Sequence, residues 1–411
     1  MLIKPLVLLA SGILSLASLA QTINESHELL WEISGNGLDS KSYLFGSLHS
    51  NDRRLFNLTD STYFALNEAE LIVLETDVFS MFSTLDTRVS SIDLNYDSEG
   101  KPYGSSSESS ETIYGDEDGM PQFLDAYFEQ YCFNADKQFF PLESVEFQLS
   151  VFSDIKTPSL ENFSFRHFLT SKNDMVDLYL EGDIYRLDEM LKGSLSMYAG
   201  GYQELIIDRN LGMAQKLDSL MQNSDSKVFC AVGAGHLAGP QGLINLLRGQ
   251  GYSVRKVVAS FSENKTKFEQ EFKSVKSYNY RNDELQLNVI FPGKPQVVTD
   301  DWNDADLNLI YRDLGQGNTY EVEVYYMEEN HDLKSLAQTY IASPEESPMR
   351  IVKFDDGSEA YEGIGDAYSE GIYWVRIMKS ENYFVILKCT GGNKFINSNR
   401  SQSFFNKVWI D

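Results

Sequence analysis

Cysteine and histidine are scarce in this chain of 411 residues, which contains three cysteines and five histidines. The cysteines, Cys132, Cys230 and Cys389, lie far apart in sequence and include no Cys-x-x-Cys pair. Three isolated cysteines support neither a disulfide scaffold nor a cysteine-based zinc site. The histidines are His27, His49, His167, His236 and His331.

Positive charge is also in short supply, because 34 lysines and arginines face 61 aspartates and glutamates, which gives a formal net charge of -27. This balance argues against nucleic acid and against an anionic membrane surface as partners, since both attract basic proteins. The charge indicates nothing more specific about the partner; the expectation of a peptide or a small-molecule substrate comes from the motifs below. The sequence predicts no particular oligomeric state.

Long apolar runs are absent except near the N-terminus, where Lys4 is followed by an almost entirely apolar or small segment, Leu6–Leu19. This segment is shorter than the ~20 apolar residues that a membrane-spanning helix requires. Ser18-Leu19-Ala20 has the small-x-small pattern of a cleavage site. The pattern predicts a signal peptide at residues 1–20 and a periplasmic or secreted protein without stable membrane insertion after cleavage.

The remaining chain is long enough for two or three domains. We place the main boundary between Lys276 and Glu284, because strand-type and helix-type segments alternate before it, whereas period-two strands dominate after it. Residues 21–276 are predicted to form an α/β domain that contains an acidic, serine-rich insertion at about 80–120. Residues 284–411 are predicted to form an antiparallel α+β domain with one helix near Leu333–Ile341.

Two tetrapeptides share one local pattern, Gly46-Ser47-Leu48-His49 and Gly233-Ala234-Gly235-His236. Each places a histidine shortly after the end of an apolar run of strand type. Ligands of open α/β sheets bind at the carboxyl ends of the strands, so we expect His49 and His236 to meet in one site. The alternative is that each is an ordinary strand-end histidine bonded to a backbone carbonyl.

Two carboxylates also follow predicted strands. Glu75 ends the apolar run Leu71–Leu74, and adjacent parallel strands would bring it to the same sheet edge as His49. The alternative is that the Glu75 side chain caps a following helix or is solvated. Glu143 follows Phe139–Leu142, and a role in capping the next helix is as well supported as a role in the site.

Arg209 lies in a predicted helix at 201–221, within the apolar stripe formed by Ile206, Met213, Leu217 and Leu220. A buried guanidinium needs an anionic or polar partner, since burying an unpaired charge costs several kcal/mol. That partner is a site carboxylate or a substrate oxygen that gains charge. A structural salt bridge remains the alternative.

A series of short stretches along residues 28–258 resembles the TraB/PrgY/GumN family, which includes the Tiki metalloproteases. They are Leu30–Gly37, Ser42–His49, Leu74–Asp77, Leu142-Glu143 with Gln148, Gly182-Asp183, Arg209-Asn210, and Val232–Leu237 with Gly242 and Gly251. The resemblance implies an α/β fold, a central sheet flanked by helices as in erythromycin esterases and ChaN-like proteins. The insertion and the C-terminal domain depart from the family pattern.

The resemblance also implies an exported metal-dependent hydrolase, with peptides as the expected substrate. A divalent metal ion (zinc, manganese or cobalt) would be held by His49, Glu75 and His236, and Arg209 would stabilise a developing oxyanion. One alternative is a metal-independent esterase-like hydrolase with a histidine base beside Glu75. Another is a haem- or peptide-binding protein without catalysis.

Overall fold

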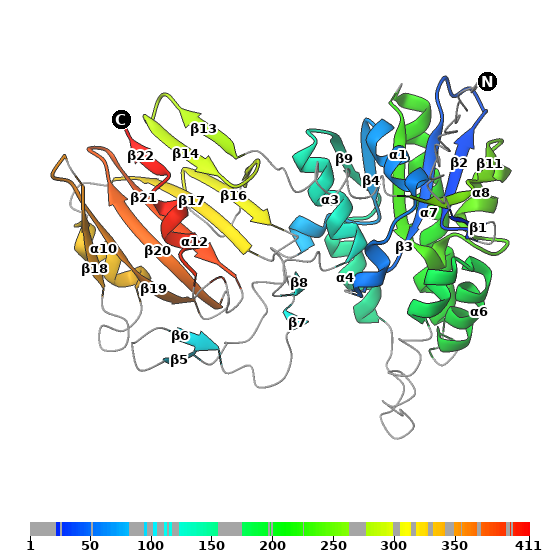
Figure 1. Cartoon of the computed structure of the whole chain (residues 1–411), viewed down its shortest axis with the longest axis horizontal. Coiled ribbons are helices and arrows are strands. Elements are labelled where there is room, and N and C mark those ends of the chain that lie inside the picture. The colour runs from blue at the N-terminus through cyan, green and yellow to red at the C-terminus, as the bar shows by residue number, and fades with distance from the viewer. Residues whose placement is uncertain are drawn as a thin grey trace, which may run out of the picture.

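The structure is a computed structural model that describes residues 22–24, 27–81, 123–154, 175–262, 277–298 and 305–411 apart from short gaps, together with short strands within 94–116. The predicted signal peptide at 1–20 lies outside the described residues, as do most of the insertion and His331. Two lobes lie side by side, the N-terminal one coloured blue to green and the C-terminal one yellow to red (Figure 1).

A six-stranded sheet forms the centre of the N-terminal lobe (Figure 1). In spatial order its strands are β11 (Ser253–Lys256), β2 (Leu30–Ser34), β3 (Ser42–Ser47), β10 (Val228–Gly233), β4 (Leu71–Leu74) and β9 (Gln138–Pro141). β3, β10, β4 and β9 run parallel, whereas β2 is antiparallel to β3 and β11. The central strands are nearly continuous apolar runs, because helices cover both faces of a parallel sheet.

Helices flank this sheet, which confirms the predicted α/β fold (Figure 1). They are α1 (Asp60–Glu68), α3 (Leu124–Asn134), α4 (Val145–Asp154), α6 (Ile184–Leu195), α7 (Asp208–Asn223) and α8 (Leu243–Gly249). Short turns of other helix types occur at Arg53–Phe56, Gln203–Ile207 and Ala234–His236, and β1 (Thr22–Asn24) pairs with β12 (Ala259–Phe261). No helix in the described ranges is long and apolar enough to cross a bilayer.

The core of this lobe contains three mutually packed phenylalanines, one each from β3, α3 and β10. The ring centroids of Phe45, Phe128 and Phe229 lie 5.3 to 5.9 Å apart, and all three side chains are buried. Burial stabilises the fold by about 1.5–3 kcal/mol for each such side chain. This cluster anchors β3 and β10, the two strands that precede the histidine motifs.

One predicted detail of the sheet is wrong. β3 and β4 are not neighbours, because β10 lies between them and pairs with both. All three strands are parallel, so Glu75 still emerges at the same edge as His49. The strand with the second histidine motif therefore occupies the centre of the site edge.

The C-terminal lobe is built from two antiparallel sheets, as the alternating pattern predicts. The larger has the order β15 (Gln296–Val297), β16 (Leu307–Asp313), β17 (Asn318–Tyr326), β21 (Tyr383–Thr390), β20 (Gly371–Lys379), β19 (Glu359–Ala367) and β18 (Arg350–Lys353). The smaller joins β13 (Tyr278–Asn282), β14 (Leu287–Phe291) and β22 (Val408–Ile410). In the part of this lobe that the structure describes, the helices α10 (Leu333–Tyr340) and α12 (Arg400–Phe405) accompany the sheets.

β13 lies within the predicted boundary region between Lys276 and Glu284. β13 occupies Tyr278–Asn282, and its pairing with β14 assigns these residues to the C-terminal lobe. β13 is an edge strand whose residues are exposed or only half-buried, so it lacks the apolar alternation that marks a strand in sequence.

Within the insertion the structure describes two short antiparallel pairs, β5 (Leu94–Tyr96) with β6 (Pro102–Gly104) and β7 (Glu111–Thr112) with β8 (Gly115–Asp116).

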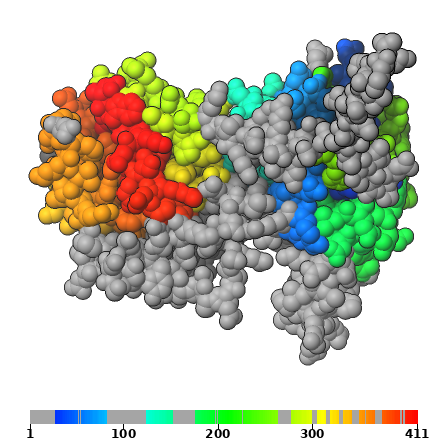
Figure 2. All heavy atoms as spheres, viewed as in Figure 1, coloured from blue at the N-terminus to red at the C-terminus, as the bar shows by residue number. Residues whose placement is uncertain are grey.

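The two lobes touch through side chains. Lys294 forms an ion pair with Asp136, and the Arg312 guanidinium lies 5.3 Å from the centroid of the Phe79 ring. In the space-filling view the yellow-to-red residues gather on the opposite side of the molecule from the blue and green ones (Figure 2). The site that follows is built by the N-terminal lobe alone.

Candidate functional site

The four residues predicted at strand ends lie along one edge of the sheet. Their order is His49 after β3, His236 after β10, Glu75 after β4 and Glu143 after β9, and these four strands are adjacent and parallel. The strand register aligns Gly233 with Ser47 and Leu74 with Pro141. The carboxyl ends of parallel strands meet at one sheet edge, so the fold brings these side chains together.

Arg209 reaches this edge from α7 and is buried. Its Nη2 donates to Glu143 Oε2 at 2.6 Å and also to Glu75 Oε1, and its Nε donates to Glu143 Oε1 at 3.1 Å. Nη1 donates to the Leu205 carbonyl at 3.2 Å. The predicted buried face is thus observed, and the anionic partners of the guanidinium are the two carboxylates of the site.

Glu75 is held as a carboxylate by four donors or positive groups. Besides Arg209, Gln148 Nε2 donates to Oε1 at 3.1 Å, and the Gly233 N–H donates to Oε2 at 3.0 Å. Burial alone would raise the pKa of Glu75, but the charges of Arg209 and His49 and the Gly233 N–H outweigh it and hold the pKa well below its usual range. Glu75 is therefore ionised over the whole physiological range.

Gly233 lies between the three candidate ligands. A Cβ placed on it would lie 3.4 Å from Glu75 Oε2, 3.5 Å from His236 Cδ2 and 3.8 Å from His49 Nε2. A larger side chain would project into the space that these groups surround. Because residue 233 is a glycine, a small space remains between the side chains of His49, Glu75 and His236.

His236 is buried, and Asn210 determines which nitrogen of its ring carries the proton. Its Nδ1 lies 2.7 Å from Asn210 Oδ1, while Asn210 Nδ2 donates to the Gln241 carbonyl at 2.9 Å. The amide orientation set by Gln241 means that Nδ1 carries the proton and Nε2 keeps its lone pair. Burial lowers the pKa of His236 to about 4, so the ring is neutral. Nε2 then faces Glu75 Oε2 at 3.8 Å.

The surroundings of His49 raise its pKa, whereas those of His236 lower it. Its Nδ1 lies 3.1 Å from Oδ2 of Asp125, a buried residue of α3 whose Oδ1 accepts from the Ser47 hydroxyl at 3.1 Å. Desolvation would lower the pKa of His49, but the Asp125 carboxylate outweighs it and raises the pKa to about 9. The side chain is 53% exposed, so water screens part of this effect. His49 carries a proton near neutral pH in the absence of a bound cation.

The donor chemistry of this edge fits a divalent metal ion. Two imidazoles and a carboxylate are common ligands of zinc, manganese and cobalt, and each ring has its Nδ1 held by a second group, as metal-bound histidines usually do. The lone pair of His236 Nε2 faces an ionised oxygen of Glu75, which is an arrangement that a cation stabilises. Among the described residues, however, no group of three or more His, Cys, Asp or Glu is close enough to hold a metal ion.

The pattern of strand ends did not reveal the groups that orient these side chains. Gln148 and Asn210 were visible only as parts of the family resemblance, and Asp125 was not identified at all. Every residue of α3 from Leu124 to Cys132 is buried. An acidic residue within so apolar a helix was the sequence signal that could have identified Asp125. Glu129 on the same helix accepts the N–H groups of Val78 and Phe79 at 2.7 and 3.0 Å and so anchors the segment after Glu75.

Comparison with known proteins gives one family and a few distant relatives. The model of the TraB/PrgY/gumN family matches residues 29–108 and 80–256. Metalloprotease TIKI2 from Danio rerio is 34% identical over 95 residues, which are 20% of this chain and 18% of that protein. The chain thus spans less than a fifth of the length of this curated relative.

Two solved structures show weak likeness. The cyanobacterial PsbP protein from Synechocystis has 6% identity and a TM-score of 0.27, over 33% of this chain and 92% of that one. The Ran-binding protein Mog1p from Saccharomyces cerevisiae has 10% identity and a TM-score of 0.23, over 33% of this chain and 95% of that one. Likeness at this level does not bear on function.

Proposed function

This chain belongs to the TraB/PrgY/gumN family, whose model covers more than half of it, and we propose that it is an exported, metal-dependent hydrolase that cleaves peptide bonds. The observation that carries the proposal is the convergence of His49, His236 and Glu75 around Gly233 at one sheet edge. The metalloprotease that matches part of the chain supports the reaction class. Export rests on the apolar pattern of residues 1–20.

His49, Glu75 and His236 would hold the divalent ion, which when bound polarises a carbonyl group and lowers the pKa of a coordinated water. The chain contributes the orientation of these donors. Asn210 keeps the lone pair of His236 on Nε2, and Asp125 holds the His49 ring through its Nδ1. Because His49 is protonated without a cation, metal binding must displace that proton, so occupancy should increase with pH.

Arg209 acts on the site through the carboxylates. Its Nε and Nη2 groups donate to Glu143 and Glu75, so the guanidinium is directed at these side chains. This geometry supports the carboxylate-partner alternative over direct contact with a substrate oxyanion. We infer that Arg209 positions Glu75 and keeps it ionised, while Glu143 holds the guanidinium in place.

A second candidate is a hydrolase without a metal, in which His236 Nε2 takes the proton from an attacking water. One observation favours it. Both oxygens of Glu75 already accept hydrogen bonds, from Arg209, Gln148 and the Gly233 N–H, and the described residues hold no three-ligand group. Burial lowers the pKa of His236 to about 4, so the ring is neutral and its Nε2 is available to accept a proton as a weak base.

Elemental analysis of the purified full-length chain, combined with cleavage of a peptide library with and without chelator, separates these candidates. The metal proposal predicts a bound divalent ion, loss of cleavage with chelator and recovery when zinc, manganese or cobalt is added. Chelator-resistant cleavage by metal-free protein would establish the second candidate instead. Absence of cleavage under every metal condition would refute both.

Glu75→Gln is the decisive variant, and Glu70→Gln is its matched control. Glu70 lies at the opposite end of β4, is exposed and accepts the Lys227 N–H at 3.1 Å. We expect Glu75→Gln to lower the rate of peptide cleavage by roughly a hundredfold or more, because it removes a metal ligand. Glu70→Gln should cleave at the wild-type rate. Equal activity of the two variants would remove Glu75 from the mechanism.

A further inference from the structure

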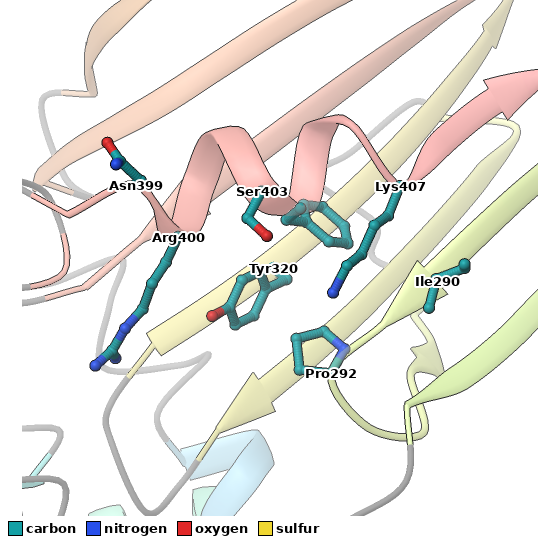
Figure 3. A pocket seen from close by; sticks show the side chains of 8 residues that line it. Ile290, Pro292, Tyr320, Asn399, Arg400, Ser403 and Lys407 are labelled. Carbon is teal, nitrogen blue, oxygen red and sulfur yellow. The ribbon is translucent and has the colours of Figure 1, made fainter.

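The C-terminal lobe contains a cavity that the hydrolase proposal does not use. It has a volume of about 330 Å³ and lies between α12 and the strands β14 and β17 (Figure 3). Cavities that bind small organic molecules begin at about 300 Å³, so this one is large enough for a small ligand and too small for a folded partner.

The base of this cavity is aromatic and apolar. Tyr320 and Phe404 are both buried, and their rings meet edge to face with centroids 5.1 Å apart. Ile290 and Pro292 complete the apolar wall on the side of β14. Burial raises the pKa of Tyr320 above its ordinary value, so its hydroxyl stays neutral and the base carries no negative charge.

Two cationic side chains border the cavity. Arg400 begins α12 and Lys407 follows its end, and Figure 3 shows them on either side of Ser403 and Tyr320. No aspartate or glutamate lines this cavity among the residues described, although the chain has 61 acidic and 34 basic residues. A positive rim without a lining carboxylate is therefore unusual for this protein.

Lys407 gives the rim a cation available for a ligand. Its backbone carbonyl accepts the Ile290 N–H at 3.0 Å, which secures the main chain beside β14. Its ammonium group forms no hydrogen bond or ion pair with any residue that the structure describes. Ser403, an exposed residue of α12, lines the same cavity, and its hydroxyl offers a second donor.

We propose that this cavity binds a small organic carboxylate with a flat, apolar body. The body contacts Tyr320, Phe404 and Pro292, and the carboxylate accepts hydrogen bonds from Lys407 and Ser403. The apolar base does not favour a bare inorganic anion, whose hydration it cannot replace. The cationic rim does not favour an uncharged ring, which would gain nothing from Lys407.

The test is a titration of the full-length protein into naphthoate, followed by the fluorescence anisotropy of this probe. Naphthalene methanol, which has the same rings and no charge, and inorganic phosphate serve as competitors. Saturable binding of naphthoate is expected, with naphthalene methanol at least tenfold weaker and phosphate ineffective at the same concentration. Lys407→Gln should weaken naphthoate binding roughly tenfold, the scale of one charge-assisted hydrogen bond.

Ser403→Leu provides a second variant, because it removes the hydroxyl donor and adds bulk at an exposed position of the cavity wall. Lys334→Gln, on exposed α10 and away from this cavity, is the charge-matched control and should bind like wild type. The proposal is overturned if Lys407→Gln and Ser403→Leu both bind naphthoate as wild type does. It is also overturned if naphthalene methanol binds equally well, or if phosphate displaces the probe.

Discussion

Replacing Arg209 by methionine removes a cation that bonds both Glu75 and Glu143. Methionine is similar in length and apolar, so it fills the same space on the buried face of α7 without bonding either carboxylate. The side chains of Glu75 and Glu143 are 7% and 5% exposed and would lose this charged partner. Gln148 and the Gly233 N–H would remain as donors.

Breaking a buried ion pair by removing one partner costs about 3–5 kcal/mol, because a charge is left buried without compensation. For a domain of this size each kcal/mol lowers the melting temperature by roughly 2–4 °C, so a decrease of roughly 6–20 °C is expected at pH 7. Arg255→Met is the control, since Arg255 pairs with Glu32 on the exposed surface of β11. An exposed pair contributes about 0–1 kcal/mol, so this control should melt near the wild type.

The pH dependence sharpens this prediction. In the wild type the pKa of Glu75 is depressed on folding, so its contribution to stability is present above its unfolded pKa of about 4.3 and is lost as the pH falls. In Arg209→Met burial is no longer offset by the guanidinium, so the folded-state pKa rises. The gap in unfolding free energy between the two proteins should therefore narrow as the pH falls from 7 to 5.

Thermal unfolding followed by circular dichroism at pH 7 and pH 5 measures this gap, and turnover per folded molecule is measured alongside it. A Met variant within about 1 kcal/mol of the wild type at pH 7 would refute the reasoning that these carboxylates depend on Arg209. A gap that widens at pH 5 would refute the assigned direction of the Glu75 shift.

Further predictions concern the other side chains of the site and the domain boundary. His49→Ala and His236→Ala should each abolish turnover and lower metal content while far-ultraviolet circular dichroism is unchanged; full metal content with full turnover in either variant would contradict a shared site. Asp125→Asn should lower the pKa of His49 from about 9 toward 6.5, measured by NMR titration of its ring protons, and an unchanged pKa would show that Asp125 is not its cause. The fragment 21–276 should stay folded and keep the activity of the full chain in a peptide-cleavage assay; loss of both would make the C-terminal lobe part of the catalytic unit.

The sequence by itself determined which residues could reach the edge of the sheet. Short apolar runs followed by Gly-x-x-His or by glutamate indicate the carboxyl ends of buried strands, and parallel strands present those ends together. The position of Arg209 within an apolar stripe determined that it would be buried, since helical periodicity is local. The alternation of apolar residues after Glu284 likewise predicted antiparallel strands.

Only the tertiary structure decided how these groups are paired. The place of β10 between β3 and β4 and the choice of Glu75 and Glu143 as partners of Arg209 result from long-range packing, which local periodicity does not encode. Asp125 and Asn210 come from helices distant in sequence. Asp125 raises the pKa of His49, whereas Asn210 determines the tautomer of His236, whose burial lowers its pKa. A pKa depends on the charge and burial that surround a ring in space, so matching motifs in sequence did not imply matching chemistry.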